Sequence, residues 1–442
     1  MKVKDRKFGI LGMARSGISA ANKVNELGGI AFISEYKAES EVSNSKKIKE
    51  TFLCEFGGHT EKLLNNEVLI VSPGIPGNIP ILQEAYKRDI EVISEIEFCY
   101  RIKHKRSKII AVTGSNGKST TVSLIHHILV TAGHSSILAG NIGVAFSSFP
   151  IEKEEIDFIV LELSSFQLEL IDTFKADVAA ILNITPDHLN RYKSFEDYAE
   201  TKFNIFNNQN SDDLAILNLD DTTSAKFTDK INSTLKYFSP DPKANIYFKN
   251  GSIILGSKEY SVQNASIKGP HNISNMMCAI LAVSSFNIER NIIQKALETF
   301  SPLTHRMEYV VEIDGIKFYN DSKATNTDSV KFALQSFDAK IRIIMGGAGK
   351  GEDYSILIPF LQKKARKVYL TGDTIDEMKT TFDGFVENES IKEFEDVIIK
   401  AFSDSKKGDI IVLSPACTSY DRFNNFEERG NTFKQIVLGL KK

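Results

Sequence analysis

Cysteine is scarce in this chain of 442 residues, and its four cysteines lie far apart. They are Cys54, Cys99, Cys278 and Cys417, and no two of them form a CxxC pair. Zinc clusters and disulfide frameworks both need closely spaced cysteines. The spacing therefore disfavours both kinds of site and fits a reducing compartment.

An excess of one charge and long apolar runs are also missing. The 54 Lys and Arg residues nearly balance the 57 Asp and Glu residues, so no overall positive field predicts binding to nucleic acid or anionic lipid. No segment approaches the roughly 20 apolar residues that a membrane-spanning helix needs. The opening residues, MKVKDRKFGILG, show no signal-peptide pattern. We therefore expect a cytoplasmic protein with no nucleic-acid partner and no membrane insertion.

The length and the patterns predict an α/β protein of three domains. A chain of 442 residues exceeds what one hydrophobic core usually organises. Apolar strands that alternate with loops and helical segments recur in three series, which begin near Phe8, Ile109 and Ile316. We predict a Rossmann-like N-terminal domain, a central P-loop ATPase-type domain and a Rossmann-like C-terminal domain. Their expected bounds are 1–98, 99–302 and 303–442.

The strongest motif is TGSNGKST, residues 113–120, which lies between an apolar strand and a helical segment. In such a loop the backbone N–H groups point at phosphate oxygens, Lys118 bridges the outer phosphates and the Ser119 hydroxyl can bind Mg²⁺. The spacing departs from GxxxxGK[ST], because Val112 stands five residues before Gly117. The strand-to-helix context still predicts a nucleoside triphosphate site.

Several polar residues follow other strands of the central series. Glu162 ends an apolar strand, where a paired structural carboxylate and a metal ligand are equally good interpretations. His188 follows another strand, and a structural role is as good an interpretation as contact with metal or substrate. Lys202 by itself resembles any lysine of an amphipathic helix. Asn272 and Asn275 are three apart and would share one helical face.

The first series carries weaker signals. The run from Gly12 to Gly17 is an incomplete glycine fingerprint, and Glu35 ends the next strand, where dinucleotide folds place an acid on a ribose. A structural turn and a solvated acid are an equally good interpretation. The loop 72–76, SPGIP, follows a further strand and is a candidate ligand loop. The basic stretch 101–108 is interpreted as a solvated linker.

The order of these motifs resembles the Mur ligase family, the ATP-dependent amide ligases of peptidoglycan precursor assembly. The resemblance covers the whole chain, and the motifs are specific in combination. They are LGMARSG, SPGIP, TGSNGKST, GNIG, LELSSFQLE, DHLNRY, GPHNISN, HRME, NDSKATN, GGAGKG and SPACTSYDRFNNFEERG. Within the family, NDSKATN and SPACTSYDRFNNFEERG resemble the ligases that add D-glutamate.

The resemblance implies an enzyme that uses ATP to join D-glutamate to UDP-N-acetylmuramoyl-L-alanine through an acyl phosphate. It implies a monomer that needs ATP and two Mg²⁺ ions. Ser119 and Glu162 would share one Mg²⁺, and His188 would contact the second together with Lys202, which would be carbamylated. Carbamylation turns a cation into an anion, which a site for metal and phosphate favours.

The resemblance also assigns residues to each ligand. The catalytic residues are Lys118, Glu162, His188, Lys202 and Arg306. The nucleotide-binding residues are Gly114, Ser115, Asn116, Gly117, Lys118, Ser119, Thr120, Asn272, Asn275, Arg306 and Asp321. The residues for the UDP-sugar are Arg15, Ser16, Glu35, Tyr36, Lys37, Gly74 and Asn141. The residues for D-glutamate are Thr325, Lys350, Ser419, Tyr420 and Phe426.

Three alternatives stay open at this level. Another Mur-type or folylpolyglutamate-type ligase would use a different acceptor. A nicotinamide-dependent oxidoreductase would use the first series for its cofactor, although the incomplete glycine fingerprint and the downstream GKST count against it. An ATP-gated scaffold would need no second metal shell, which Glu162, His188 and Lys202 together suggest.

Overall fold

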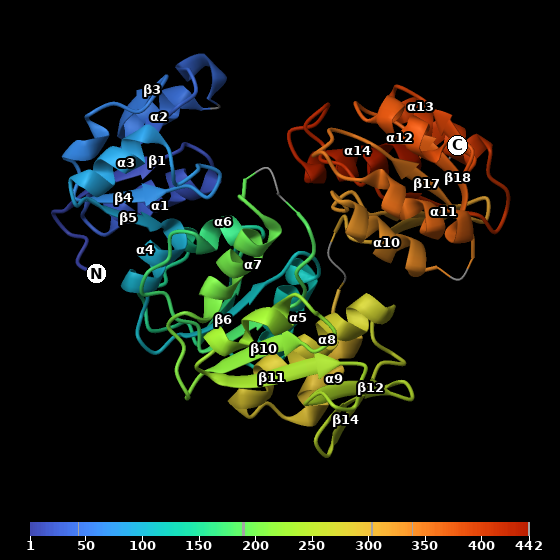
Figure 1. Ribbon diagram of the computed structural model, residues 1–442, viewed down its shortest axis with the longest axis horizontal. Coiled ribbons are helices and arrows are strands. Elements are labelled where there is room, and N and C mark those ends of the chain that lie inside the picture. The colour runs from blue at the N-terminus through green and yellow to red at the C-terminus, as the bar shows by residue number, and fades with distance from the viewer. Residues whose placement is uncertain (43, 188–190, 302–303, 338, 441–442) are drawn as a thin grey trace. The chain divides into compact units, whose positions relative to one another are not determined.

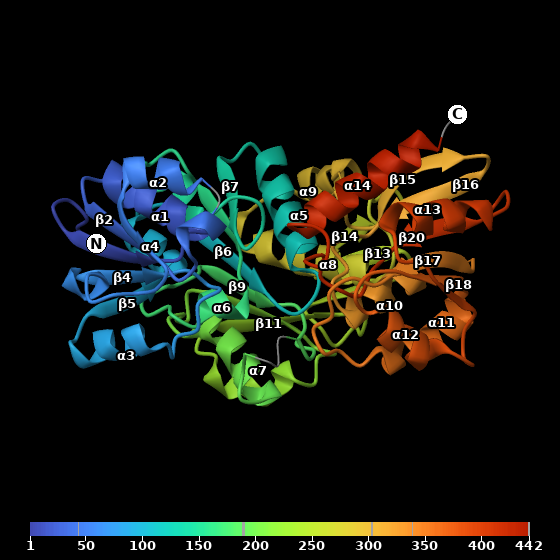
Figure 2. The ribbon, with the colours of Figure 1, turned by 90° about the horizontal axis from the view of Figure 1, so that it is seen from above.

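The computed structural model describes residues 1–42, 44–187, 191–301, 304–337 and 339–440, and Figures 1 and 2 show it in two views. It divides into two compact units, Met1–Ala265 with Asn272–Phe300 and Ser266–His271 with Ser301–Lys442. The described strands form three sheets, two in the first unit and one in the second. The predicted domain boundaries at 98 and 302 stay predictions, and the first falls inside helix α4 (Glu95–Ile102).

The first sheet is fully parallel, with the strand order β3-β2-β1-β4-β5. Its strands are β1 (Lys7–Leu11), β2 (Ile30–Glu35), β3 (Leu53–Phe56), β4 (Val68–Val71) and β5 (Glu91–Ser94). Its helices are α1 (Arg15–Glu26), α2 (Ser45–Thr51), α3 (Pro80–Lys87) and α4. Phe8, Ile10 and Ile70 face one core with α1 and α4, whereas Leu69 and Val71 face another with α3, so helices cover both faces (Figure 2).

The second sheet has the order β14-β13-β12-β11-β10-β9-β6-β8-β7. The seven neighbouring strands from β12 to β7 in this order, with β6 among them, are all parallel. At the other edge, β12, β13 and β14 form a short antiparallel meander. The strands are β6 (Lys108–Thr113), β7 (Ser136–Gly140), β8 (Phe158–Glu162), β9 (Val178–Ile181), β10 (Leu214–Asn218), β11 (Thr234–Ser239), β12 (Ile246–Lys249), β13 (Ser252–Leu255) and β14 (Lys258–Ser261). The helices are α5 (Lys118–Thr131), α6 (Ser165–Leu168), α7 (Phe195–Phe203), α8 (Pro270–Val283) and α9 (Arg290–Thr299).

The third sheet, in the second unit, has the order β15-β16-β20-β17-β18-β19 and is parallel except at β15. Its strands are β15 (Glu308–Ile313), β16 (Ile316–Asn320), β17 (Ile341–Met345), β18 (Ala365–Leu370), β19 (Asn388–Ser390) and β20 (Ile410–Leu413). Its helices are α10 (Thr327–Gln335), α11 (Ile358–Lys364), α12 (Ile375–Phe382), α13 (Phe394–Ser403) and α14 (Phe426–Gly439). Helices α10 to α12 pack on one face, and α13 and α14 pack on the other (Figure 2).

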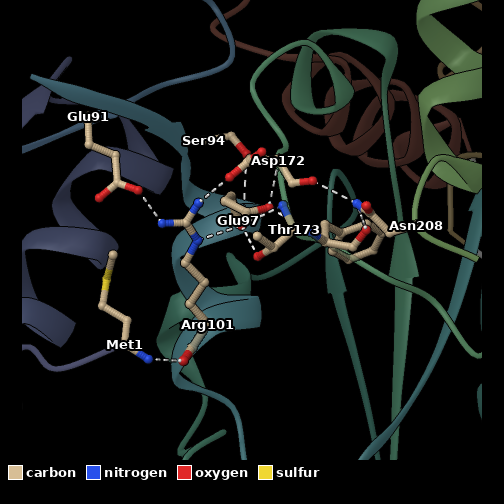
Figure 3. Close-up of polar contacts among 9 residues, drawn as sticks. Met1, Glu91, Ser94, Glu97, Arg101, Asp172, Thr173 and Asn208 are labelled. Carbon is tan, nitrogen blue, oxygen red and sulfur yellow. Dashed lines mark hydrogen bonds and ion pairs between the residues drawn. The ribbon is translucent and has the colours of Figure 1, made fainter. Parts of the chain in front are cut away.

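Helix α4 corrects the interpretation of residues 101–108 as a solvated linker. Arg101 lies in the last turn of α4. Its guanidinium pairs with Glu97 at 2.6 Å, with Asp172 at 3.0 Å and with Glu91 (Figure 3). The buried Glu97 carboxylate also accepts hydrogen bonds from the backbone N–H groups of residues 172–174 and from the Thr173 hydroxyl. Burial opposes ionisation of Glu97, but the hydrogen bond from the Thr173 side chain leads a set that lowers its pKa on balance. The first part of the stretch therefore ties helix α4 to the segment that precedes β9.

No helix among the described residues combines the length and the apolar character that crossing a membrane requires.

Candidate active site

The loop between β6 and α5 has the geometry of a phosphate-binding loop. Gly114 and Gly117 have φ values of 144° and 85°, which L side chains rarely adopt. A Cβ atom on Gly117 would lie 2.5 Å from Oδ1 of Asn275, so only glycine fits there. Gly117 is the N-cap of α5, and the first free N–H groups of that helix point out of its end, where an anion binds favourably.

Asn183, which follows β9, holds this loop in place. Its Oδ1 accepts the N–H of Asn116 at 2.8 Å, and its backbone oxygen accepts the N–H of Ser115 at 2.9 Å. Its Nδ2 donates to the backbone oxygen of Asn116 at 3.1 Å. Sequence reasoning missed this residue, although its place after a buried strand beside the loop was a usable signal.

Two lysines converge on one carbonyl of the loop. Lys118 Nζ donates to the backbone oxygens of Gly114 at 2.7 Å and of Ser115 at 2.8 Å. Lys202, on α7, donates to the same Gly114 oxygen at 3.2 Å, and its ammonium lies 4.6 Å from the centre of the Tyr198 ring. Burial, followed by the charge of Lys118, lowers the pKa of Lys202 well below its ordinary value. The structure thus brings together these two predicted residues.

Glu162 lies beside the phosphate loop at the end of β8. It is paired with Val112 in the register of β6 and β8, and it is 1% exposed. Its Oε1 accepts Nδ2 of Asn141 at 2.9 Å. Asn141, predicted to hold the UDP-sugar, therefore also orients this carboxylate.

The predicted Mg²⁺ ligands fit a site that a nucleotide completes. Mg²⁺ is usually held by one or two carboxylates plus substrate phosphates and water, so the buried Glu162 and the Ser119 hydroxyl in the first turn of α5 are a suitable donor set. The described residues contain no group of three His, Cys, Asp or Glu side chains arranged around a metal. His188 lies outside the described residues, so its predicted role in a second site stays a prediction.

The pair of asparagines on α8 shares one helical face, as predicted. Nδ2 of Asn275 donates to Oδ1 of Asn272 at 3.2 Å, and the Thr121 hydroxyl donates to Oδ1 of Asn275 at 3.3 Å. This contact joins α8 to the first turn of α5. Thr120 lies in that same turn.

The other two residues predicted to bind the nucleotide, Arg306 and Asp321, lie in the second unit. Asp321 follows β16 and accepts hydrogen bonds from the Ser414 hydroxyl at 2.9 Å and from the N–H of Met307 at 3.2 Å. Burial raises the pKa of Asp321 to about 7, with Arg306 among the groups that oppose the rise. The two residues are thus electrostatically coupled within one loop cluster.

The residues predicted for D-glutamate gather on loops at the carboxyl ends of adjacent parallel strands. Thr325 follows β16, Lys350 follows β17, and Ser419 and Tyr420 follow β20, in the strand order β16-β20-β17. Ligands of open parallel sheets bind at this edge. Tyr420 is 72% exposed and Ser419 is buried, so solvent reaches the side chain of Tyr420 but not that of Ser419. Phe426 begins α14 and stacks under the Lys323 ammonium at 4.6 Å.

Arg429, which sequence reasoning did not single out, ties two of these loops together. Its side chain is 2% exposed. It donates to the backbone oxygens of Ser322, Cys417 and Thr418 at 2.7 to 3.0 Å and to the Ser322 hydroxyl at 3.0 Å. Burial lowers the pKa of Arg429 to about 10. A buried guanidinium among carbonyl groups therefore shapes the predicted D-glutamate site.

A cavity of about 1050 Å³ opens at the carboxyl edge of the first sheet. Five of the residues predicted for the UDP-sugar line it: Ser16, Glu35, Tyr36, Lys37 and Gly74. Arg15 is not among its lining residues and instead donates to the backbone oxygen of Gly143. The Glu35 carboxylate accepts the N–H of Met13 at 2.7 Å and that of Lys37 at 3.1 Å, so it shapes the glycine loop of this sheet. Sequence reasoning missed His59, which also lines the cavity.

Three family models match successive parts of the chain. They are the MurD-like N-terminal domain of Mur ligases at residues 6–94, the Mur ligase middle domain at 112–283 and the glutamate ligase domain of Mur ligases at 305–417. The chain therefore belongs to the Mur ligase family, and the three-domain α/β fold predicted from the sequence is confirmed.

Particular relatives match over nearly the full length. The UDP-N-acetylmuramoylalanine--D-glutamate ligase of Salinibacter ruber is 37% identical, with 99% of each chain covered. The ligase of the same name from Alkaliphilus oremlandii is 36% identical, with both chains fully covered. Among solved structures, the UDP-N-acetylmuramate-alanine ligase MurC of Thermotoga maritima has a TM-score of 0.64 at 17% identity and covers 99% of this chain and 100% of its own. A likeness at that identity reports on the fold alone.

Proposed function

We propose that this protein is the ATP-dependent ligase that joins D-glutamate to UDP-N-acetylmuramoyl-L-alanine in peptidoglycan precursor synthesis. The observation that carries the proposal is its 37% identity, over 99% of both chains, to a ligase with that name. We assign ATP to the phosphate loop, the UDP-sugar to the cavity of the first sheet and D-glutamate to the loop cluster of the third sheet. We place the enzyme in the cytoplasm and expect it to act as a monomer.

The reaction we propose has two steps. The alanine carboxylate of the UDP-sugar attacks the γ-phosphorus of ATP, which forms an acyl phosphate and releases ADP. The amine of D-glutamate then attacks the acyl carbon, and phosphate leaves as the amide bond forms. Water competes with that amine, which is a physical reason for the substrates to be enclosed during the reaction.

The residues of the phosphate loop would supply positioning and charge. Lys118, now bound to loop carbonyls at 2.7 and 2.8 Å, would exchange these contacts for phosphate oxygens. Glu162 and Ser119 would hold Mg²⁺, which neutralises charge on the transferred phosphoryl group. Such preorganised charge accounts for most of the acceleration in phosphoryl transfer.

Carbamylation of Lys202 is part of the proposal. Only a neutral amine adds CO₂, and burial together with the nearby Lys118 favours the neutral form of Lys202. The product is an anion, which removes the repulsion between two ammonium groups that share the Gly114 oxygen. Incubation with ¹³C-bicarbonate should give a carbamate carbon signal in NMR spectra that is absent from Lys202→Ala. A spectrum without that signal at saturating bicarbonate contradicts the modification.

The third sheet would select the amino acid. Lys350 and the loops that carry Thr325, Ser419, Tyr420 and Phe426 would surround D-glutamate, with a carboxylate of the substrate paired to Lys350. The assignment of Arg306 and Asp321 to the nucleotide rests on the family resemblance of the HRME and NDSKATN motifs.

The experiment is an assay of phosphate release with ATP, Mg²⁺ and UDP-N-acetylmuramoyl-L-alanine. D-glutamate, L-glutamate, glycine and L-alanine are offered in parallel, and Lys118→Ala is the inactive control. Release that depends on D-glutamate supports the proposal. Release with another acceptor moves the assignment to another Mur-type or folylpolyglutamate-type ligase, and release with none contradicts a ligase.

A further inference from the structure

His59 lies in the loop after β3 and lines the cavity of the first sheet. Its Nδ1 lies 2.7 Å from the Ser34 hydroxyl, which in turn lies 2.7 Å from Oε1 of Glu55. Nothing in the assignment of substrate residues uses this chain of three side chains. Its hydrogens can be placed because each member has a limited set of donors and acceptors.

Glu55 determines the direction of the chain. It accepts hydrogen bonds from the N–H of Thr60 at 2.9 Å, from the Thr60 hydroxyl at 2.6 Å and from the Ser34 hydroxyl. Burial opposes ionisation, but these hydrogen bonds outweigh it and lower the pKa of Glu55. An ionised carboxylate only accepts, so the single proton of Ser34 points to Glu55. Ser34 must then accept a hydrogen bond from His59, which places a proton on Nδ1.

The other ring nitrogen of His59 is therefore an acceptor. Burial lowers the pKa of His59, with Glu35 and Glu55 opposing, so the ring is neutral at neutral pH. A neutral ring with its proton on Nδ1 carries a lone pair on Nε2. Within the described residues, Nε2 has no hydrogen-bond partner. The cavity is thus lined by a histidine whose tautomer is determined by its hydrogen bond to Ser34, which Glu55 orients.

A second aromatic ring stands beside this acceptor. Tyr36 is 77% exposed and also lines the cavity, and its ring centre lies 6.3 Å from that of His59. An exposed aromatic side chain in a cavity offers a flat apolar face to a planar ligand. The pair therefore combines a stacking surface with a directed hydrogen-bond acceptor, which suits a nucleoside.

We propose that His59 selects the nucleoside of the sugar nucleotide by accepting, at Nε2, a hydrogen bond from the uracil N3–H or from a ribose hydroxyl. Ser34 and Glu55 are positioning residues that keep Nε2 in its acceptor form. The identity of the nucleoside rests on the proposed function, whereas the acceptor and its tautomer rest on the contacts of His59 alone.

The test is calorimetric titration of the full chain with UDP, 2′-deoxy-UDP and 3-methyl-UDP. The wild-type protein should bind one analogue about tenfold more weakly than UDP, because one hydrogen bond is lost. His59→Phe keeps the ring but lacks both nitrogens, so it should bind UDP about tenfold more weakly and no longer distinguish UDP from that analogue. The analogue that the wild-type protein penalises identifies the donor as uracil N3–H or ribose hydroxyl.

Two further variants separate this role from a structural one. His59→Gln can return an acceptor near the position of Nε2 and should recover part of the preference for UDP. His134→Phe changes a histidine between α5 and β7 that contacts Phe158 edge-on and does not line the cavity, so its UDP affinity should equal that of the wild-type protein. The affinity of His59→Phe for ATP should be unchanged, which checks its fold.

Three results overturn the inference: no UDP binding by the wild-type protein, wild-type UDP affinity and discrimination in His59→Phe, or an equal loss for UDP and ATP. These titrations need no turnover. A His59-dependent preference for UDP without D-glutamate-dependent phosphate release would therefore overturn the proposed function and support this inference. D-glutamate-dependent phosphate release together with unchanged UDP binding in His59→Phe would support the proposed function and overturn this inference.

Discussion

In both the first and the second sheet, one strand leads through a glycine loop into a helix, and the two loops differ in the side chains that contact their backbone. In the first sheet β1 leads through Gly12, with φ of 94°, into α1. In the second, β6 leads through Gly114 and Gly117 into α5. Both loops lie at the carboxyl edge of a parallel sheet, where ligands bind.

The side chains that reach each loop differ in charge. In the first loop the N–H of Met13 donates to the Glu35 carboxylate at 2.7 Å, so an internal anion already occupies that amide. In the second, the N–H of Asn116 donates to the neutral amide of Asn183, and the ammonium groups of Lys118 and Lys202 lie on the loop. The two ammonium groups therefore favour a polyphosphate at the second loop. The comparison therefore assigns the triphosphate of ATP to the second loop.

The largest effect should come from the second loop. Lys118→Ala removes the cation that faces the phosphates, so phosphate release should fall on the order of 10³-fold. UDP affinity, measured by calorimetry, should not change, because the first loop is untouched. The matched control is Lys105→Ala, an exposed lysine outside both loops. A parallel loss of UDP affinity would mean that the two loops are not independent.

A third glycine loop, after β17, extends the comparison. Here Gly347 has φ of 144°, and Ala348 forms a two-hydrogen-bond bridge with Thr418, whose backbone oxygen also accepts from Arg429. Arg429→Met removes the donor to the buried carbonyl oxygens of Ser322 and Cys417, each worth about 1 kcal/mol, whereas the Thr418 oxygen keeps the N–H of Ala348. The free energy of unfolding should therefore fall by about 2 kcal/mol. Urea denaturation followed by circular dichroism measures it. Arg366→Met, at a more exposed arginine, is the control, and an equal loss there contradicts the role of Arg429.

A smaller effect should follow from the acid in the first loop. Glu35→Gln has one oxygen where two backbone N–H groups need acceptors, so Met13 or Lys37 loses its partner. The KM for the UDP-sugar should rise about tenfold, with little change in the KM for ATP. Steady-state kinetics with each substrate varied in turn separates the two constants. A rise in the ATP constant alone would reverse the assignment of the two loops.

The smallest effect is a pH dependence of UDP binding. Burial lowers the pKa of His59, so its ring stays neutral across the neutral range and is protonated only below its ordinary value of 6.5. Protonation turns Nε2 into a donor, and UDP affinity should therefore decline as the pH falls through that lowered pKa, by about threefold more than in His59→Phe. Calorimetry at several pH values gives both curves. If the wild-type protein and His59→Phe lose UDP affinity in parallel as the pH falls, the pH dependence comes from the phosphates of UDP and not from His59.

Local patterns in the sequence were sufficient for much of the fold. The apolar runs Val68–Val71 and Ile341–Met345 are strands over their whole length, and helix α5 begins inside TGSNGKST, the motif that the sequence places before a helical segment. TGSNGKST predicted the phosphate loop because the positive φ values at Gly114 and Gly117 are a local requirement. By contrast, no capping side chain marks the start of α1 at Arg15, so the local sequence does not locate that helix start.

What the sequence alone determined is where strands, helices and glycine loops lie, since these depend on neighbours along the chain. Only the tertiary structure decided which side chains meet. Asn183 lies 67 residues from Asn116, Arg429 lies 107 residues from Ser322, and His59 lies 25 residues from Ser34. Arg101, which looked like part of a solvated stretch, pairs with Asp172 from the segment before β9. Such contacts depend on how the sheets and helices pack. A buried polar group needs a hydrogen-bond partner, and that partner comes from whichever segment packs beside it, however distant in the sequence.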